Sequence, residues 1–340
     1  MSTGALHILA RGAVTAVGLD AAQTCAAIRA KVKRFTPLSA QLLDHEDPPI
    51  GARVAADPRL RIDEREWLLN LAARALSQCA LDPATALLWQ VPEPQREHPL
   101  CAGVPDAALL AELRRKLGLP LSEHSRVLHG GAASLIEGLA IARELIGAGS
   151  VERCVIGGAD SLLRPADLDA LARDQRTLGP GRSQGLVPGE GAAFVVVGRG
   201  QATPAIVGLG LAFERKTAVS GELSVGDGFV QAFESAIQAA ELGEPDIEFV
   251  AGNVNGERYD AWEVAHAHAR CYRTRRERLA TLWPARSTGE IGVASGAMAL
   301  IAASTAIAEG YAPGTTATLE LRSEGELRGV AVLRHIDVQG

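Results

Sequence analysis

The sequence predicts a large, layered α/β protein built from two similar halves. Of its 340 residues, 47% are hydrophobic but only 4% are aromatic, so closely packed Ala, Leu, Val and Ile must form the core, as is typical of layered α/β folds. Strand-like and helical runs alternate along the chain. A glycine, two apolar residues and a serine precede an apolar helix at Gly131–Ser134 and again at Gly292–Ser295. We interpret this repeat as an internal duplication with a period of about half the chain.

The first half opens with a βα unit. Residues 6–18 have strand character, and residues 19–32 form a helix with Asp20 near its start, where a carboxylate can accept hydrogen bonds from free amides. The next expected segments are an irregular stretch at 34–63, a helix at 65–80, an apolar run at 84–91, an interruption at 92–105, a helix at 107–118 and a strand-like piece at 125–131.

A mostly buried helix lies in the stretch 128–150. Its apolar residues follow helical spacing while its two glutamates share a narrow polar face. The helix ends at the turn 147–149, and a strand at 151–163 follows. The apolar residues are Leu135, Leu139, Ala142 and Ile146, and the glutamates are Glu137 and Glu144.

The second half repeats this order of elements. Residues 198–204 resemble a linker, strand character resumes at 205–214, and residues 289–321 form a second helix-and-strand unit. We therefore expect an N-terminal half at 1–200, with loop insertions near 34–63 and 90–125, and a C-terminal half at 201–340.

Charge and cysteine content argue against several classes of protein. The net charge of −6 provides no general attraction to nucleic acid or to an anionic membrane. No apolar run is long enough for a membrane span, and the N-terminus does not resemble a secretory signal. Five widely spaced cysteines form no metal-binding pattern and are expected to be reduced thiols of a cytoplasmic protein. They are Cys25, Cys79, Cys101, Cys154 and Cys271.

Five stretches, in the same order along the chain, resemble the landmarks of β-ketoacyl synthases of the thiolase superfamily. They are VTAVGLDAAQTCAAIRA, GGAASLIEGLAIARELI, CVIGGADSLL, SQGLVPGEGAAFVVV and STGEIGVASGAMALIAA. The resemblance covers nearly the whole chain. It implies a thiolase-like, layered αβαβα fold of two duplicated halves, each with a five-stranded mixed sheet. It also implies a protein that is usually dimeric and uses no cofactor.

The resemblance also implies where the catalytic residues should lie, and this sequence departs from the pattern at each place. The family's nucleophilic cysteine, at the start of a buried helix that lowers its pKa, corresponds to Gly131. Its two histidines, which donate hydrogen bonds to the enolate oxygen, correspond to Asn255 and Glu290. The Phe-containing gate near the last strand corresponds to residues 324–329, which lack phenylalanine.

Each substitution has a structural and a functional interpretation. Gly131 leaves an open pocket floor or marks a drifted site in which only packing matters. Asn255 can donate a hydrogen bond, or it can form a turn with the following glycine. Glu290 would repel a developing enolate, and it can instead cap the following helix.

Other candidate residues are weaker. His129 can line the remaining pocket or be a satisfied core histidine, and Ser134 has no histidine placed to activate it. His266 and His268 are two residues apart, which makes a poor metal pair on a helix. Residues 185–193 are expected to form a hairpin or turn. A basic run, either a docking patch for an acidic carrier protein or a solvated helix end, contains Arg270, Arg273, Arg275, Arg276 and Arg278.

The sequence thus predicts a ketosynthase-like pseudoenzyme without metal or cofactor that acts as a protein-binding partner. It would form a homodimer or a heterodimer with another thiolase-fold subunit. One version is a chain-length-factor-like subunit, with acyl carrier protein as a further partner. Another is an adaptor that resembles thiolase-like proteins found beside type VI secretion effectors. The alternative is a hydrolase or acyltransferase that uses Glu290 and Asn255.

Overall fold

A computed structural model describes residues 4–38, 49–55, 63–118, 121–179, 181–201 and 203–336. Much of the expected loop insertion at 34–63 lies outside these residues, and its described part forms the two-stranded sheet of β2 and β3. The elements of the first half are β1 (Leu6–Thr15), α1 (Ala21–Arg29), β2 (Phe35–Pro37), β3 (Ile50–Ala52), α2 (Glu64–Leu76), the 3₁₀ turn Ser77–Cys79, β4 (Ala86–Gln90), α3 (Asp106–Leu117), β5 (Arg126–Leu128), α4 (Ser134–Gly147), β6 (Arg153–Ser161), α5 (Pro165–Arg173) and β7 (Glu190–Gly198).

The second half repeats this order. Its elements are β8 (Ala205–Phe213), α6 (Asp227–Ala239), the 3₁₀ turn Glu244–Asp246, β9 (Phe249–Gly252), α7 (Arg258–Cys271), β10 (Ala280–Leu282), α8 (Ala285–Thr288), α9 (Ala294–Ala308), β11 (Thr316–Arg322) and β12 (Leu327–Arg334).

The strand order demonstrates the duplication. The large sheet runs β5-β4-β6-β7-β1 through the first half and β10-β9-β11-β12-β8 through the second. When the five strands of each half are numbered in chain order, their order across the sheet is 3-2-4-5-1 in both halves. In each half, the two strand pairs nearest the free edge are parallel, and the two pairs nearest the junction of the halves are antiparallel. The halves join edge to edge through only two residue pairs of β1 and β8, Leu6 with Ile206 and His7 with Ala205.

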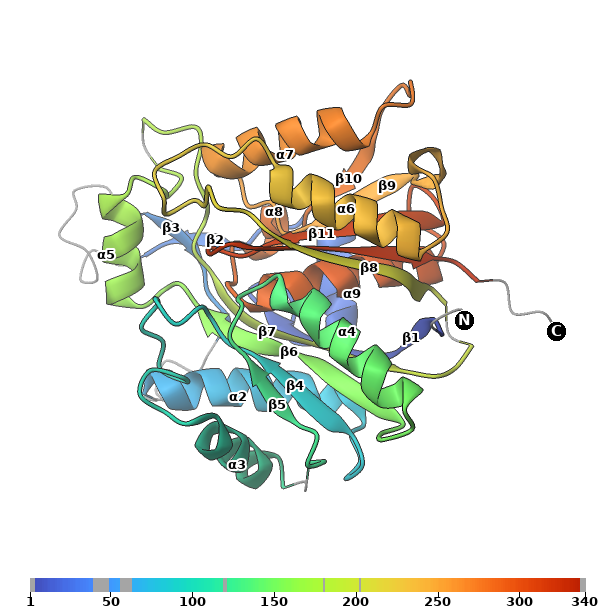
Figure 1. The fold of residues 1–340 in the computed structure, drawn as a ribbon. Helices are drawn as coiled ribbons and strands as arrows, with labels where there is room; N and C mark the ends of the chain where they lie inside the picture. The colour runs from blue at the N-terminus through green and yellow to red at the C-terminus, as the bar shows by residue number, and fades with distance from the viewer. Residues whose placement is uncertain are drawn as a thin grey trace.

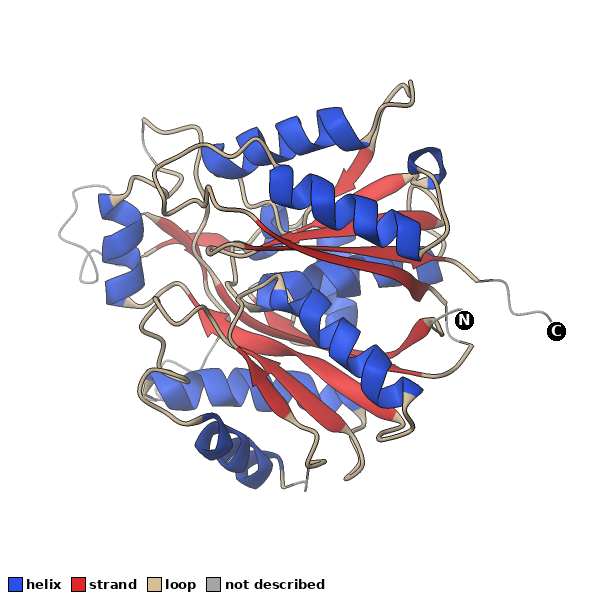
Figure 2. Ribbon diagram, in the orientation of Figure 1, coloured by secondary structure: helices blue, strands red, loops and turns tan. Residues whose placement is uncertain are grey.

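The five strands of the first half form one layer, the first sheet, and those of the second half form another, the second sheet. Helices cover the outer faces of both sheets and also fill the space between them (Figures 1 and 2). Helices α2 and α3 lie on the outer face of the first sheet, α6 and α7 on the outer face of the second, and α4 and α9 between the two. Helix α9 is apolar and buried almost all round, which suits a helix with sheets on both sides. The predicted αβαβα fold class is confirmed.

Local sequence explains how several helices begin. Asp20 and Asp63 stand directly before α1 and α2 and accept hydrogen bonds from the amides of Gln23 (2.7 Å) and Glu66 (2.8 Å). Helix α4 is capped from the other half of the chain. The hydroxyl of Ser323 accepts a hydrogen bond from the amide of Ala133 at 2.9 Å.

The prediction of a hairpin or turn at 185–193 is wrong. Leu186 and Pro188 form isolated bridges with Thr177 and Glu290, and from Glu190 onward the chain is the central strand β7. The glycines suggested a turn, but the segment is extended, and Pro188 and Gly189 pair with Glu290 and Ala52, which are remote in sequence. The extended segment therefore supports the backbone of Glu290, whose amide donates to the carbonyl of Val187 at 2.8 Å.

Candidate functional site

Gly131 lies in the turn between β5 and α4, with a φ of +64°. This left-handed conformation costs a residue with a side chain about 1–2 kcal/mol. The space beside Gly131 is also occupied, because a β-carbon there would lie 2.7–2.9 Å from the carboxylate of Glu93. Glu93 is held in this place by the amide of Gly325, which donates to its Oε1 at 2.8 Å. Gly131, predicted from the sequence to stand at the nucleophile position, therefore faces a carboxylate from the segment that follows β4.

Asn255 and Glu290 contact each other. The side-chain amide of Asn255 donates to Oε2 of Glu290 at 3.0 Å. Oε1 of Glu290 accepts from the hydroxyl of Ser295 (2.6 Å) and the amide of Gly292 (2.9 Å). Both carboxylate oxygens are thus engaged, and one of them ties Glu290 to the start of α9.

The beginnings of α4 and α9 lie against each other, because a β-carbon on Gly296 would overlap the carbonyl of Ala132. The two turns share a conformation: φ is +64° at Gly131 and +58° at Gly292. Gly292 also faces a carboxylate, since a β-carbon there would overlap Asp160. The duplication therefore extends to a glycine and an opposing acid in each turn.

Burial raises the pKa values of two acids, Glu290 and Asp260. Glu290 is 7% exposed, and burial raises its pKa to about 7, although the hydrogen bond from Ser295 and the charge of Arg322 act in the opposite direction. Burial also raises the pKa of Asp260 to about 6, against the opposing charge of Arg322. The carboxyl groups of Glu290 and Asp260 therefore take up a proton at a higher pH than exposed carboxyl groups do.

A buried ion network surrounds Asn255 and Glu290. Glu257 is 4% exposed and accepts from Arg176 (2.6 and 3.0 Å), Arg322 (3.0 Å) and the side-chain amide of Asn255 (3.0 Å). Arg322 also forms an ion pair with Asp260, which in turn accepts from the backbone amide of Asn255 at 3.1 Å. Arg176 belongs to the first half and the other members to the second, so the network joins the two halves.

Asp160 is the centre of a second buried cluster. It pairs with Arg96 (2.7 Å) and His98 (3.0 Å), and it accepts from the amide of Val293 at 3.0 Å. Burial opposes its ionisation, but Arg96 and His98 outweigh burial and hold the pKa of Asp160 well below its usual range. This carboxylate links the end of β6 to the turn before α9.

The region expected to replace the family gate contacts the ion network and Glu93. Glu324 binds Arg176 at 2.7 Å, and Gly325 binds Glu93. Arg328 is completely buried and pairs with Glu263 at 3.0 Å. Residues 324–329 thus hold charged groups in place at the turn between β11 and β12.

The weaker candidates lie in structural contacts. Ser134 is fully buried, and its hydroxyl donates to the carbonyl of Gly131 at 2.7 Å and accepts from Gln90 at 3.1 Å. His129 has a side chain that is 38% exposed and binds Asp106 at 2.8 Å. Neither residue contacts Asn255 or Glu290 through a hydrogen bond.

Two arginines of the basic run at residues 270–278 form ion pairs with acids of the same chain. Arg270 pairs with Asp227 at 2.6 Å, and Arg276 is half-buried in an ion pair with Glu244. The exposed members also include Arg273, Arg275 and Arg278.

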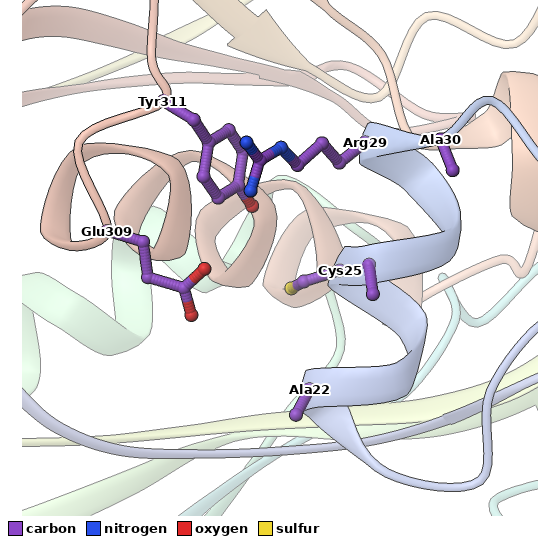
Figure 3. Close-up of a pocket in the computed structure, with 7 residues that line it drawn as sticks. Ala22, Cys25, Arg29, Ala30, Glu309 and Tyr311 are labelled. Carbon is purple, nitrogen blue, oxygen red and sulfur yellow. The ribbon is translucent and has the colours of Figure 1, made fainter.

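A cavity of about 330 Å³ lies away from these positions, between α1 and the end of α9 (Figure 3). The guanidinium of Arg29 stands over the ring of Tyr311 at 4.4 Å, and the side chains of Cys25 and Glu309 point into the space beside this pair. Burial raises the pKa of the Cys25 thiol, which keeps it protonated and unreactive. All five cysteines are free.

Glu93, Arg96, Arg176 and Arg322 carry only a weak sequence signal. The first two lie in the charged run 93–98, directly after the buried strand β4, and this position is the one clue to their role. Within the described ranges, no group of three or more His, Cys, Asp and Glu side chains could hold a metal ion, and no helix is both long and apolar enough to span a bilayer.

Similar structures fix the fold. A ketosynthase in complex with its chain length factor from Xenorhabdus doucetiae superposes with a TM-score of 0.76 at 13% identity, over 98% of both chains. The chain has the ketosynthase fold. The ketosynthase from module 6 of the bacillaene synthase of Bacillus subtilis 168 gives a TM-score of 0.78 at 12% identity, over 98% of this chain and 73% of that one.

The ishigamide ketosynthase/chain length factor gives a TM-score of 0.76 at 18% identity, over 98% and 99% of the two chains. No protein-family model and no curated protein matches the sequence. The fold is therefore shared with a ketosynthase of a synthase module and with chains of ketosynthase and chain length factor structures.

Proposed function

We propose that this chain is a non-catalytic subunit with a ketosynthase fold, which acts by pairing with a second thiolase-fold chain. The observation that carries the proposal is the carboxylate of Glu93 beside Gly131. A covalent acyl intermediate needs a nucleophile at this position, and a negative charge beside it would oppose both the attacking thiolate and the oxyanion.

The contacts of Asn255 and Glu290 support the same proposal. A general base must present a free oxygen to its substrate. Both oxygens of Glu290 accept hydrogen bonds from the protein, and the amide of Asn255 is bound to Glu290 and Glu257. These side chains stabilise the loops of the former catalytic site.

Pairing with another chain is supported by the open edge of the first sheet. Strand β5 lies at the end of the strand order, and within the part of the chain that the structure describes it pairs with β4 alone. Free backbone groups on an edge strand readily pair with a strand of another chain. Because β5 leads directly to Gly131, a partner on this edge would lie next to the substituted site. Two of the similar structures are described as complexes of a ketosynthase with a chain length factor.

An acyl-loading assay tests the loss of catalysis. The purified protein is incubated with a short acyl thioester and its mass is measured, with an intact ketosynthase as the positive control. We expect no acyl adduct. An adduct that maps to any residue of the site would contradict the proposal.

Recovery of the tagged protein from its native cells tests the pairing, with native mass spectrometry of the eluted complex. A 1:1 complex with a thiolase-fold chain that retains the cysteine and both histidines supports the chain-length-factor-like role, and acyl carrier protein would be a further component. A stable complex with a secretion effector supports the adaptor role. A homodimer or monomer would contradict heterodimer formation.

One observation favours the second candidate, an acyl-thioester hydrolase or acyltransferase. A carboxyl group with a pKa of about 7, as at Glu290, suits acid–base catalysis near neutral pH. Thioester turnover by the wild type, abolished in Glu290→Gln, would establish this activity.

A further inference from the structure

Most of the large apolar side chains that are exposed in the described residues belong to the second half. Phe213 and Val219 are 69% and 68% exposed, and Leu223 and Val225 follow in the loop that carries Val219. Trp262 of α7 is also exposed, at 39%. Together they make up five of the seven large apolar side chains that are exposed in the described residues. A concentration of this kind marks an interaction surface more often than a solvated one.

Val219, Leu223 and Val225 lie in the loop that follows β8 and runs along α7. Phe213 ends β8 on the side of the strand opposite to Ala212, which packs against α6, so Phe213 is not part of this surface. The hydroxyl of Tyr259 donates to the carbonyl of Lys216, and Arg270 donates to the carbonyl of Val225 at 3.3 Å. Gly226 lies against Ala267, where a β-carbon would stand 2.8 Å from its side chain. Helix α7 and the loop therefore form one continuous surface at the outer side of the molecule (Figure 1).

The solvent-facing side of α7 has the composition of a helix-binding surface. Its exposed positions repeat at helical spacing and include three alanines four residues apart. Small side chains in a row allow the close approach of another helix. The exposed residues are Arg258, Ala261, Trp262, Ala265, Ala269 and Arg270.

Charge on this face is mainly positive. In the loop the exposed Glu222 is paired with Lys216, and the exposed Asp227 beside the loop is paired with Arg270. Three acids at the start of α7 and just before it are buried. Between residues 258 and 278 the only exposed acid is Glu277. The exposed arginines outnumber it by five to one in a protein whose net charge is −6. The buried acids are Glu257, Asp260 and Glu263, and the exposed arginines are Arg258, Arg270, Arg273, Arg275 and Arg278.

We propose that the outer face of α7 and the adjoining loop 214–225 bind an acidic, amphipathic α-helix of a partner protein. The apolar row between Ala261 and Ala269 would receive the apolar side of that helix, and the arginines at both ends would attract its acidic residues. A second copy of this chain fits poorly, because it would place the same arginines opposite one another. This surface is separate from the β5 edge and does not depend on the proposed function.

Fluorescence anisotropy tests the proposal with a panel of labelled acidic amphipathic peptides, each with a leucine stripe flanked by glutamate. Control peptides carry lysine in place of glutamate. We expect the acidic peptides to bind the full-length protein, with an affinity that falls as salt is added, and the lysine peptides not to bind. Equal binding of both sets, or no binding of any acidic peptide, would overturn the proposal.

The variant Ala265→Glu places a negative charge in the middle of the face without removing any buried contact. We expect it to weaken peptide binding by at least about tenfold, because like charges oppose each other at a contact. The matched control is Ala26→Glu, which changes an exposed alanine of α1 and should bind as the wild type does. Circular dichroism confirms that both variants fold.

Two further measurements exclude other occupants. Binding to phosphatidylcholine vesicles containing phosphatidylglycerol, lost in Ala265→Glu without any peptide binding, would assign the face to a membrane and overturn the proposal. A dimer in analytical ultracentrifugation that Ala265→Glu converts to monomer would assign the face to a second copy and overturn it as well.

Discussion

The carboxylate of Glu93 and the missing side chain of Gly131 are complementary, because the first occupies the space that the second leaves free. A hydrogen bond from Gly325 fixes this arrangement, and Gly325 lies in the turn that would carry the family gate. The residue opposite Gly131 and the turn between β11 and β12 are therefore structurally linked. A cysteine at residue 131 would have to displace both Glu93 and its contact.

Restoring the nucleophile tests this relationship. Gly131→Cys should destabilise the protein by more than about 1–2 kcal/mol, because the left-handed backbone disfavours a side chain and the β-carbon overlaps Glu93. Part of the loss should be recovered when Glu93→Ala is added. Urea denaturation of the two single variants and the double variant provides the comparison. A Gly131→Cys protein as stable as the wild type would contradict the structural role of Glu93.

More of the fold than of the site can be predicted from the sequence. Helical spacing and the repeated Gly131 and Gly292 turns are local patterns, and together they indicate two equivalent layered halves. The substituted positions follow from the family landmarks. The ion network does not, because its partners meet only through the topology: Arg176 and Glu324 are separated by 148 positions along the chain.

A neutral residue at position 290 should change how stability depends on pH. Burial raises the pKa of Glu290 from 4.5 to about 7, so between these values the native state holds a proton that the unfolded state has released. Stability should then fall as the pH rises through this window, by about 3 kcal/mol from this group, and stay level above it.

Glu290→Gln removes that contribution, so its stability should fall less than that of the wild type between pH 5 and pH 7.5. The shifted pKa of Asp260, about 6, acts in the same direction and remains in the variant. Urea denaturation at several pH values measures the two slopes. Parallel slopes would show that the shift at Glu290 is absent.

Glu257 should be among the most important acids for stability. It receives hydrogen bonds from Arg176 and Arg322. Glu257→Gln would remove the counter-charge that the two arginines share, and because each keeps one further acid, Glu324 or Asp260, the cost should be about 2–3 kcal/mol. Glu222 provides the control, because its ion pair with Lys216 is largely exposed. Glu222→Gln should change stability by less than about 1 kcal/mol, and a similar loss in both variants would contradict the role of burial.

The pair of Arg328 and Glu263 should behave as a single unit. Both side chains are completely buried, and the guanidinium also donates to the carbonyls of Gly325 (2.8 Å) and Leu327 (2.9 Å). Arg328→Met would leave Glu263 as an isolated buried charge, and Glu263→Leu would do the same to Arg328. Each single variant should therefore lose about 3–5 kcal/mol.

The double variant removes both charges, so its loss should be smaller than the sum of the single losses by at least about 1.5 kcal/mol. The exposed pair of Lys216 and Glu222 serves as the control cycle, with an expected coupling below about 1 kcal/mol. Urea denaturation of the four proteins in each cycle gives both couplings. Additive losses at Arg328 and Glu263 would mean that the carbonyl contacts, rather than the ion pair, hold β12 against α7.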